Sequence, residues 1–93
     1  MTFDDELKLM ITAYLGVLEL DEYDLKVLIL KEMEDNIKKF ISSSNINLKE
    51  KYDEYENVDL VTKLQNSLIV LNSMNGPMDL IILIKRKLER MKW

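Results

Sequence analysis

The sequence contains no cysteine and no histidine. Without cysteine the chain can form no disulfide, no thiolate nucleophile and no cysteine-ligated zinc or iron–sulfur site. Without histidine it lacks the commonest general base and metal ligand, and every catalytic triad that depends on an imidazole is excluded. We therefore expect a protein that is not an enzyme and that has no catalytic residues.

Glycine and proline are also scarce, with two glycines, Gly16 and Gly76, and one proline, Pro77. A phosphate-binding loop or a dinucleotide fingerprint needs several glycines close together, and a calcium-binding loop needs one between its oxygen ligands. Neither glycine lies in such a frame. We therefore expect no cofactor and no metal ion.

Long apolar runs are absent as well. The longest, from Leu80 to Ile84, is far shorter than the roughly 18 residues that span a bilayer. The first residues, Thr2 to Glu6, are acidic where a secretory signal would be basic. The sequence thus predicts no transmembrane segment and a cytoplasmic location.

What the chain does have is bulky aliphatic residues. Hydrophobic residues make up 47% of its 93 positions, and only one of them, Ala13, is alanine. A chain of this length is expected to form one domain, residues 1–93, which buries only about 60–65% of the surface that its unfolded form exposes. The surplus either packs into a tight core or is covered by a partner or a second copy.

Apolar residues recur at helical spacing in five segments, which predicts an all-α fold. Gly16 is expected to end the first helix, Asp21 to cap the second and Asn57 to cap the fourth, and Asn75, Gly76 and Pro77 separate the last two. The link from Val17 to Leu20 is expected to be extended. The predicted helices span about residues 3–15, 22–41, 48–56, 58–74 and 77–92. They form a small helical bundle of four main helices plus one short helix, 48–56.

The second predicted helix has an unusual first half. Residues 25–30 are apolar almost all round, which in a helix indicates burial on several sides. Its inward stripe is expected to run from Tyr23 through Val27 and Leu30 to Phe40.

Charge is distributed unevenly along the chain. Residues 1–60 hold 15 acidic and 7 basic side chains, whereas residues 61–93 hold 6 basic and 2 acidic ones, so the two parts carry −8 and +4. Such an asymmetry can steer a partner or orient a head-to-tail assembly. Neutralisation within the fold is the favoured interpretation.

The C-terminal segment, 75–93, carries the most specific pattern, because an apolar stretch is followed by a strongly basic one that ends in tryptophan. We expect this segment to be a docking element, although it could also pack on its own domain. The predicted partner-binding residues are Met78, Leu80, Ile81, Leu83, Lys85, Arg86, Lys87, Leu88, Arg90, Met91 and Trp93.

Two smaller features suggest further contacts. Tyr52 and Tyr55 share one face of the short helix and form either a secondary contact patch for a basic partner or a pin that holds this helix in place. Methionines usually fill gaps in a core, but Met74 and Met78, which bracket the last turn, could instead line an adaptable groove.

The leading hypothesis is a small acidic, non-enzymatic protein–protein interaction module that docks a helical face on its partner. Adaptors, inhibitors, immunity-type proteins and assembly components, including those of viruses and mobile elements, belong to this class. One alternative is a nucleic-acid-binding regulator that uses the basic C-terminal helix, which is less favoured because its first turns are apolar and acidic. The other is a structural homo-oligomer such as a ring or connector subunit.

Overall fold

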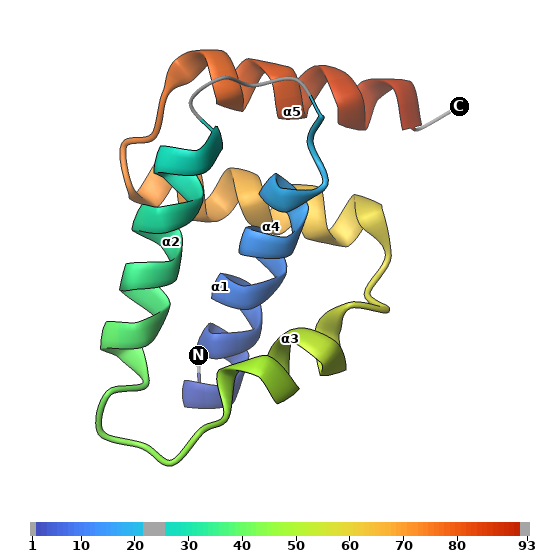
Figure 1. The fold of residues 1–93 in the computed structure, drawn as a ribbon. Helices are drawn as coiled ribbons and strands as arrows, with labels where there is room; N and C mark the ends of the chain where they lie inside the picture. Colours follow the sequence, from blue (N-terminus) through green and yellow to red (C-terminus); the bar gives the residue numbers. More distant parts are fainter. Residues whose placement is uncertain (1, 22–25, 92–93) are drawn as a thin grey trace.

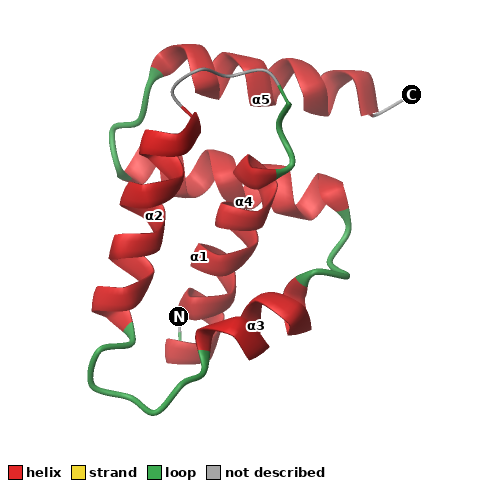
Figure 2. Cartoon of the chain, in the orientation of Figure 1, coloured by secondary structure: helices red, strands yellow, loops and turns green. Residues whose placement is uncertain are grey.

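The computed structural model describes residues 2–21 and 26–91, and this part of the chain forms five α-helices and no strand (Figures 1 and 2). The all-helical fold predicted from the sequence is therefore confirmed. The helices are α1 (Phe3–Leu18), α2 (Lys26–Phe40), α3 (Leu48–Tyr55), α4 (Leu60–Ser73) and α5 (Met78–Met91).

The helix α1 is the central element, because it packs against α2, α3 and α4. Figure 1 shows α2 beside α1 and antiparallel to it, with α4 crossing behind α1. The helix α5 packs on α4 and runs antiparallel to it, at the end of the molecule opposite to α3 and the start of α1 (Figure 1).

The first helix is longer than predicted, because Gly16 lies inside α1 and does not end it. Gly16 is buried where α4 crosses, and a Cβ atom there would lie 2.6 Å from the carbonyl oxygen of Lys63. The glycine thus serves close helix packing. Val17 and Leu18, predicted to be extended, complete the helix, and the Lys26 ammonium group donates hydrogen bonds to the carbonyls of Leu18 (2.6 Å) and Leu20 beyond its end.

The predicted start of the second helix, with Tyr23, lies outside the described residues. In α2 the buried residues are Ile29, Met33 and Ile37, whereas Val27 and Leu28 are 74% and 65% exposed. The prediction of burial on several sides was wrong at these two positions. Apolar composition alone does not provide a neighbour for each face, and among the described helices only α1 comes close to the backbone of α2.

Local capping signals account for most other helix starts. Thr2 caps α1 and Asn47 caps α3, each accepting a hydrogen bond from the backbone three residues later. The cap of α4 is Asp59 and not the predicted Asn57. At the last turn the left-handed residue is Asn75, with φ of 55°, while the backbone amide of Gly76 donates to the carbonyl of Leu71 at 2.8 Å.

The buried side chains form two clusters. The larger one joins the second half of α1 to α2, α4 and α5, and its members are Ala13, Val17, Leu20, Ile29, Met33, Leu64, Leu71, Leu80, Ile81 and Ile84. The smaller one joins another side of α1 to the end of α2 and consists of Leu7, Ile11, Leu15 and Ile37, with partly buried side chains of α3 packed against it. The helix α5 therefore belongs to the larger cluster and α3 to the smaller one.

Candidate functional site

The apolar stripe of α5 is buried at one end of the helix and open at the other. This helix is the most strongly amphipathic of the five. Leu80 and Ile84 are fully buried, Leu88 one turn later is half-buried, and Met91 is 36% exposed. The stripe thus continues beyond the part of the core that covers it. We call residues 83–91 the α5 terminal segment.

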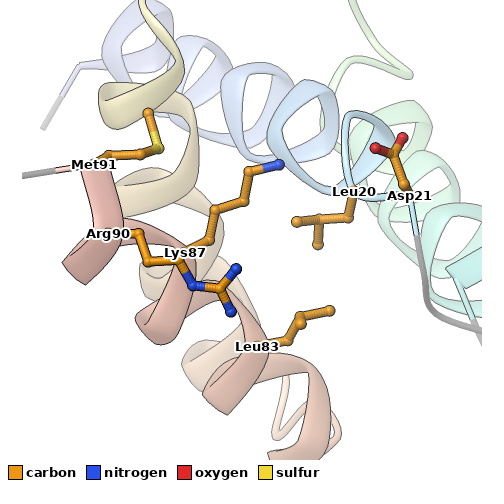
Figure 3. A pocket seen from close by; sticks show the side chains of 6 residues that line it. All are labelled: Leu20, Asp21, Leu83, Lys87, Arg90 and Met91. Carbon is orange, nitrogen blue, oxygen red and sulfur yellow. The ribbon is translucent and has the colours of Figure 1, made fainter.

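A pocket of about 420 Å³ lies between this segment and the residues that follow α1. It is lined by Leu20, Asp21, Leu83, Lys87, Arg90 and Met91. We call it the Leu20 pocket. In Figure 3 the side chains of Leu83, Lys87 and Arg90 reach from α5 toward Leu20, and the carboxylate of Asp21 lies beyond Leu20 on the far rim.

A second pocket, of about 500 Å³, lies on the opposite side of α5, against α4. It is lined by Val61, Gln65, Leu68, Lys85, Leu88, Glu89 and Met91. We call it the Leu68 pocket. Because Met91 lines both pockets, the last turn of α5 is the point that they share.

The α5 terminal segment is basic, with Lys85, Arg86, Lys87 and Arg90 against a single acid, Glu89. Among the described residues the ion pairs are Lys38–Glu34, Lys51–Glu54 and Lys63–Glu19, and none involves α5. Of the basic side chains described after residue 60, only that of Lys63 forms an ion pair with a described acid. The sequence analysis favoured neutralisation of the two charged parts within the fold. Among the described residues, the Lys63–Glu19 pair is the one ion pair that joins them.

The acidic first turn of α1 is too distant to offset these bases. It contains Asp4, Asp5 and Glu6, whereas the Leu20 pocket begins beyond the other end of the same helix. A helix of 16 residues is about 24 Å long, and the Debye length at physiological ionic strength is about 8 Å. The acids in the first turn of α1 therefore do not offset the bases around the Leu20 pocket.

The structure divides the predicted partner-binding residues into groups. Leu83, Lys85, Lys87, Leu88, Arg90 and Met91 surround the two pockets, and Arg86 is exposed beside them. Leu80 and Ile81 are buried in the core, so they are not available to a partner in this fold. Met78 is 64% exposed but lies at the opposite end of α5, and Trp93 lies outside the described residues.

Sequence reasoning missed the residues that other elements contribute to the pockets. These are Leu20, Asp21, Val61, Gln65 and Leu68. Val61 and Leu68 lie at helical spacing with Leu64, which favours the inner face of α4, and nothing local to Leu20 indicates that it lies beside α5. The packing of α5 on α4 brings Val61, Gln65 and Leu68 beside α5, and the segment that follows α1 brings Leu20 and Asp21 there.

Tyr52 and Tyr55 of α3 both lie against side chains of α1. The ring of Tyr52 stacks on that of Tyr14 in α1, with centroids 5.2 Å apart, and its hydroxyl is buried without a hydrogen-bond partner among the described residues. This burial raises the pKa of Tyr52 to about 12. The ammonium groups of Lys8 and Lys51 lie 5.8 and 5.9 Å from the centre of the Tyr55 ring. Both tyrosines thus contact the chain itself, as in the pinning alternative.

The structure contains a methionine-lined groove. Of Met74 and Met78, which were expected to line such a groove, only Met74 does so. The groove has a volume of about 270 Å³ between α1, α2 and α4, and Met10, Met33 and Met74 line it together with Ile69, which is 55% exposed. Met78 is not part of it. The groove carries one charged side chain, Glu6.

In residues 2–21 and 26–91, no group of three or more acidic side chains could hold a metal ion. None of the five described helices is long and apolar enough to cross a membrane.

No protein-family model, curated protein or solved structure matches this chain. Its function is therefore inferred from its own residues alone.

Proposed function

We propose that this protein is a non-enzymatic interaction module of helical-bundle type that docks another protein through the α5 terminal segment. An adaptor, an inhibitor, an immunity-type protein or an assembly component would act in this way. The observation that carries the proposal is the open end of the α5 stripe, where Leu88 is half-buried at the edge of the core and Met91, 36% exposed, lines both pockets.

The composition of this surface supports a protein partner. Protein interfaces typically combine an apolar centre, on which most of the binding energy depends, with a polar rim that remains solvated. Here Leu83, Leu88 and Met91 supply the apolar part, while Lys85 and Arg90 stand beside it. Filling the pockets with apolar side chains of a partner would remove this surface from water, which is the main favourable term in association.

Nucleic acid and lipid fit this surface less well. The first turn of α5 presents Asp79 and an exposed Met78, not the basic and polar tip of a recognition helix. An anionic bilayer would need apolar side chains that project outward together with the bases. Leu88 and Leu83 instead lie half-buried against the core.

The test compares two methionines at opposite ends of the same helix. The tagged protein is used to capture partners from its native lysate, with and without nuclease, alongside Met91→Asp and the control Met78→Asp. We expect the wild type and Met78→Asp to recover one protein at constant stoichiometry, and Met91→Asp to lose it, because a buried carboxylate at the docking surface is costly.

Three results would contradict the proposal. If Met91→Asp recovers the partner protein as well as the wild type does, the interface does not include the α5 terminal segment. Recovery that nuclease abolishes would indicate a nucleic-acid-binding regulator, and light scattering that finds only copies of this chain would indicate a structural homo-oligomer.

A further inference from the structure

We infer that the Leu20 pocket takes an acidic peptide segment of a partner protein, with an apolar side chain on Leu83 and Met91, above the buried Leu20, and neighbouring carboxylates on Lys87 and Arg90. The inference rests on the proposed function of the α5 terminal segment. It adds which pocket is occupied and what chemistry the partner presents.

The apolar part of this pocket favours a peptide over a small anion. Leu20 is almost fully buried and forms part of the larger core cluster, and Leu83 packs against the same cluster. Leu20 is therefore the floor of the pocket, and its accessible apolar surface comes from the half-buried Leu83 and from Met91, an adaptable side chain at the exposed end of α5. A free phosphate or carboxylate ion would leave this apolar surface in water. The volume of about 420 Å³ is within the usual range, about 300–1,000 Å³, of ligand-binding pockets.

The charged part of the pocket selects the sign of the partner. Lys87 and Arg90 are three residues apart on α5 and thus lie on the same side of the helix. Both side chains reach from α5 toward Leu20 in Figure 3, and Asp21 is the one acid among the lining residues. Neither base forms an ion pair with another described residue. An arginine can bind a carboxylate through two parallel hydrogen bonds, which adds geometric selectivity to the attraction.

The Leu68 pocket on the other side of α5 lacks this selectivity. Its lining carries one base, Lys85, and one acid, Glu89, so its rim has no net charge. The methionine-lined groove carries only Glu6. Of the Leu20 and Leu68 pockets, only the Leu20 pocket has more bases than acids among its described lining residues.

The test is a selection of short random peptides, displayed on phage, against the full-length protein. Enriched peptides are synthesised with a fluorescent label, and their affinity is measured by fluorescence anisotropy. We expect the enriched peptides to combine a large apolar residue with two or more Asp or Glu residues. Their affinity should fall about tenfold or more in Lys87→Glu/Arg90→Glu, and also on addition of salt.

The matched control is Lys31→Glu/Lys39→Glu, which makes the same change of charge at exposed positions of α2. It should bind the acidic peptides within about twofold of the wild type, since distant charges at the surface are screened by salt. Far-UV circular dichroism checks that both double variants are folded. Peptides in which Lys replaces the acidic residues should regain affinity for Lys87→Glu/Arg90→Glu.

The outcomes separate the inference from the proposed function. Enriched peptides that lose affinity with Met91→Asp but not with Lys87→Glu/Arg90→Glu would overturn the inference and leave the docking surface in place. Peptides that are insensitive to both changes, or a selection that enriches none, would overturn both. If the protein self-associates and Lys87→Glu/Arg90→Glu abolishes this, the pocket takes a second copy of the chain and the inference is overturned. If the protein binds a labelled 20-nucleotide strand and the same variant abolishes this, the pocket takes nucleic acid and the inference is likewise overturned.

Discussion

Gly16 of α1 lies directly against the backbone of Lys63 in α4, so that a Cβ on Gly16 would approach the Lys63 carbonyl oxygen to 2.6 Å and its carbonyl carbon to 2.9 Å. The hydroxyl of Ser67 lies still closer, and it donates hydrogen bonds of 2.8 Å to the carbonyls of Ala13 and Lys63. Lys63 at the same crossing is only 3% exposed. Its ammonium group donates hydrogen bonds to the carboxylate of Glu19 and to the backbone carbonyl of Glu56. The contact between α1 and α4 thus depends on the absence of a side chain at one position.

Gly16→Ala is expected to destabilise the protein, although alanine is the better helix former by about 1 kcal/mol. The added methyl group would have to displace the backbone of α4, and overpacking of this kind costs about 1–3 kcal/mol. Urea denaturation followed by circular dichroism measures the effect. The control Asn72→Ala, on the exposed side of α4, should change the free energy of unfolding by no more than about 0.5 kcal/mol. Equal stability of Gly16→Ala and the wild type would show that the two helices are not in close contact.

Tyr52→Phe is expected to leave the protein equally stable or to stabilise it by about 1 kcal/mol at neutral pH. The hydroxyl is buried without a partner among the described residues, and an unsatisfied polar group costs stability that its removal restores. A marked loss of stability, measured by urea denaturation, would show that the hydroxyl does have a partner.

The same tyrosine predicts a loss of stability in alkali. Burial holds the pKa of folded Tyr52 at about 12, whereas the unfolded residue ionises near its usual pKa of about 10. Below the unfolded value both states are protonated, so the stability is fully present, and it is lost as the pH rises through the folded value. Denaturation midpoints measured from neutral pH to about pH 12 should therefore fall. The fall should be smaller in Tyr52→Phe but not absent, because burial and the negative charge of Glu34 also raise the pKa of Tyr14. An identical fall in the variant would contradict this assignment.

Asp59 is expected to stabilise the start of α4 in a pH-dependent manner. Its carboxylate accepts hydrogen bonds from the amide (3.1 Å) and the hydroxyl (2.8 Å) of Thr62, which lower its pKa. The stability is therefore present above the usual pKa of an aspartate and is lost as the pH falls through the lowered value. Asp59→Ala should be less stable than the wild type at neutral pH, and the difference should shrink in acid. Asp59→Asn, which can still cap the helix, should lie between the two.

The two ends of the α5 stripe are expected to differ in their effect on stability. Leu80→Ala removes a fully buried side chain and should cost about 2–5 kcal/mol. Met91→Ala removes one that is 36% exposed and should cost less than about 1 kcal/mol. Thermal denaturation of both variants checks this. A large loss of stability with Met91→Ala would mean that Met91 is a core residue. It would contradict the proposed docking role of the α5 terminal segment.

The existence of the five helices was predictable because its signals are local. Thr2 caps α1 through a hydrogen bond to the backbone of Asp5, and the Asn75–Gly76–Pro77 sequence separates α4 from α5. Both signals act within a few residues and are legible without a structure. Gly16 misled the sequence analysis because the same residue type ends helices and also lets helices pack closely. Only the position of α4 distinguishes the two uses.

The sequence by itself determined that α5 is an amphipathic helix that becomes basic toward its end, since both properties follow from the order of its residues. Tertiary structure alone decided that Leu80 and Ile84 are buried while Met91 is left at the surface, and that Leu20 and Leu83 share a pocket with Lys87 and Arg90. The reason is physical. The periodicity of a helix determines which residues share a face, whereas the burial of that face depends on where the neighbouring helices end.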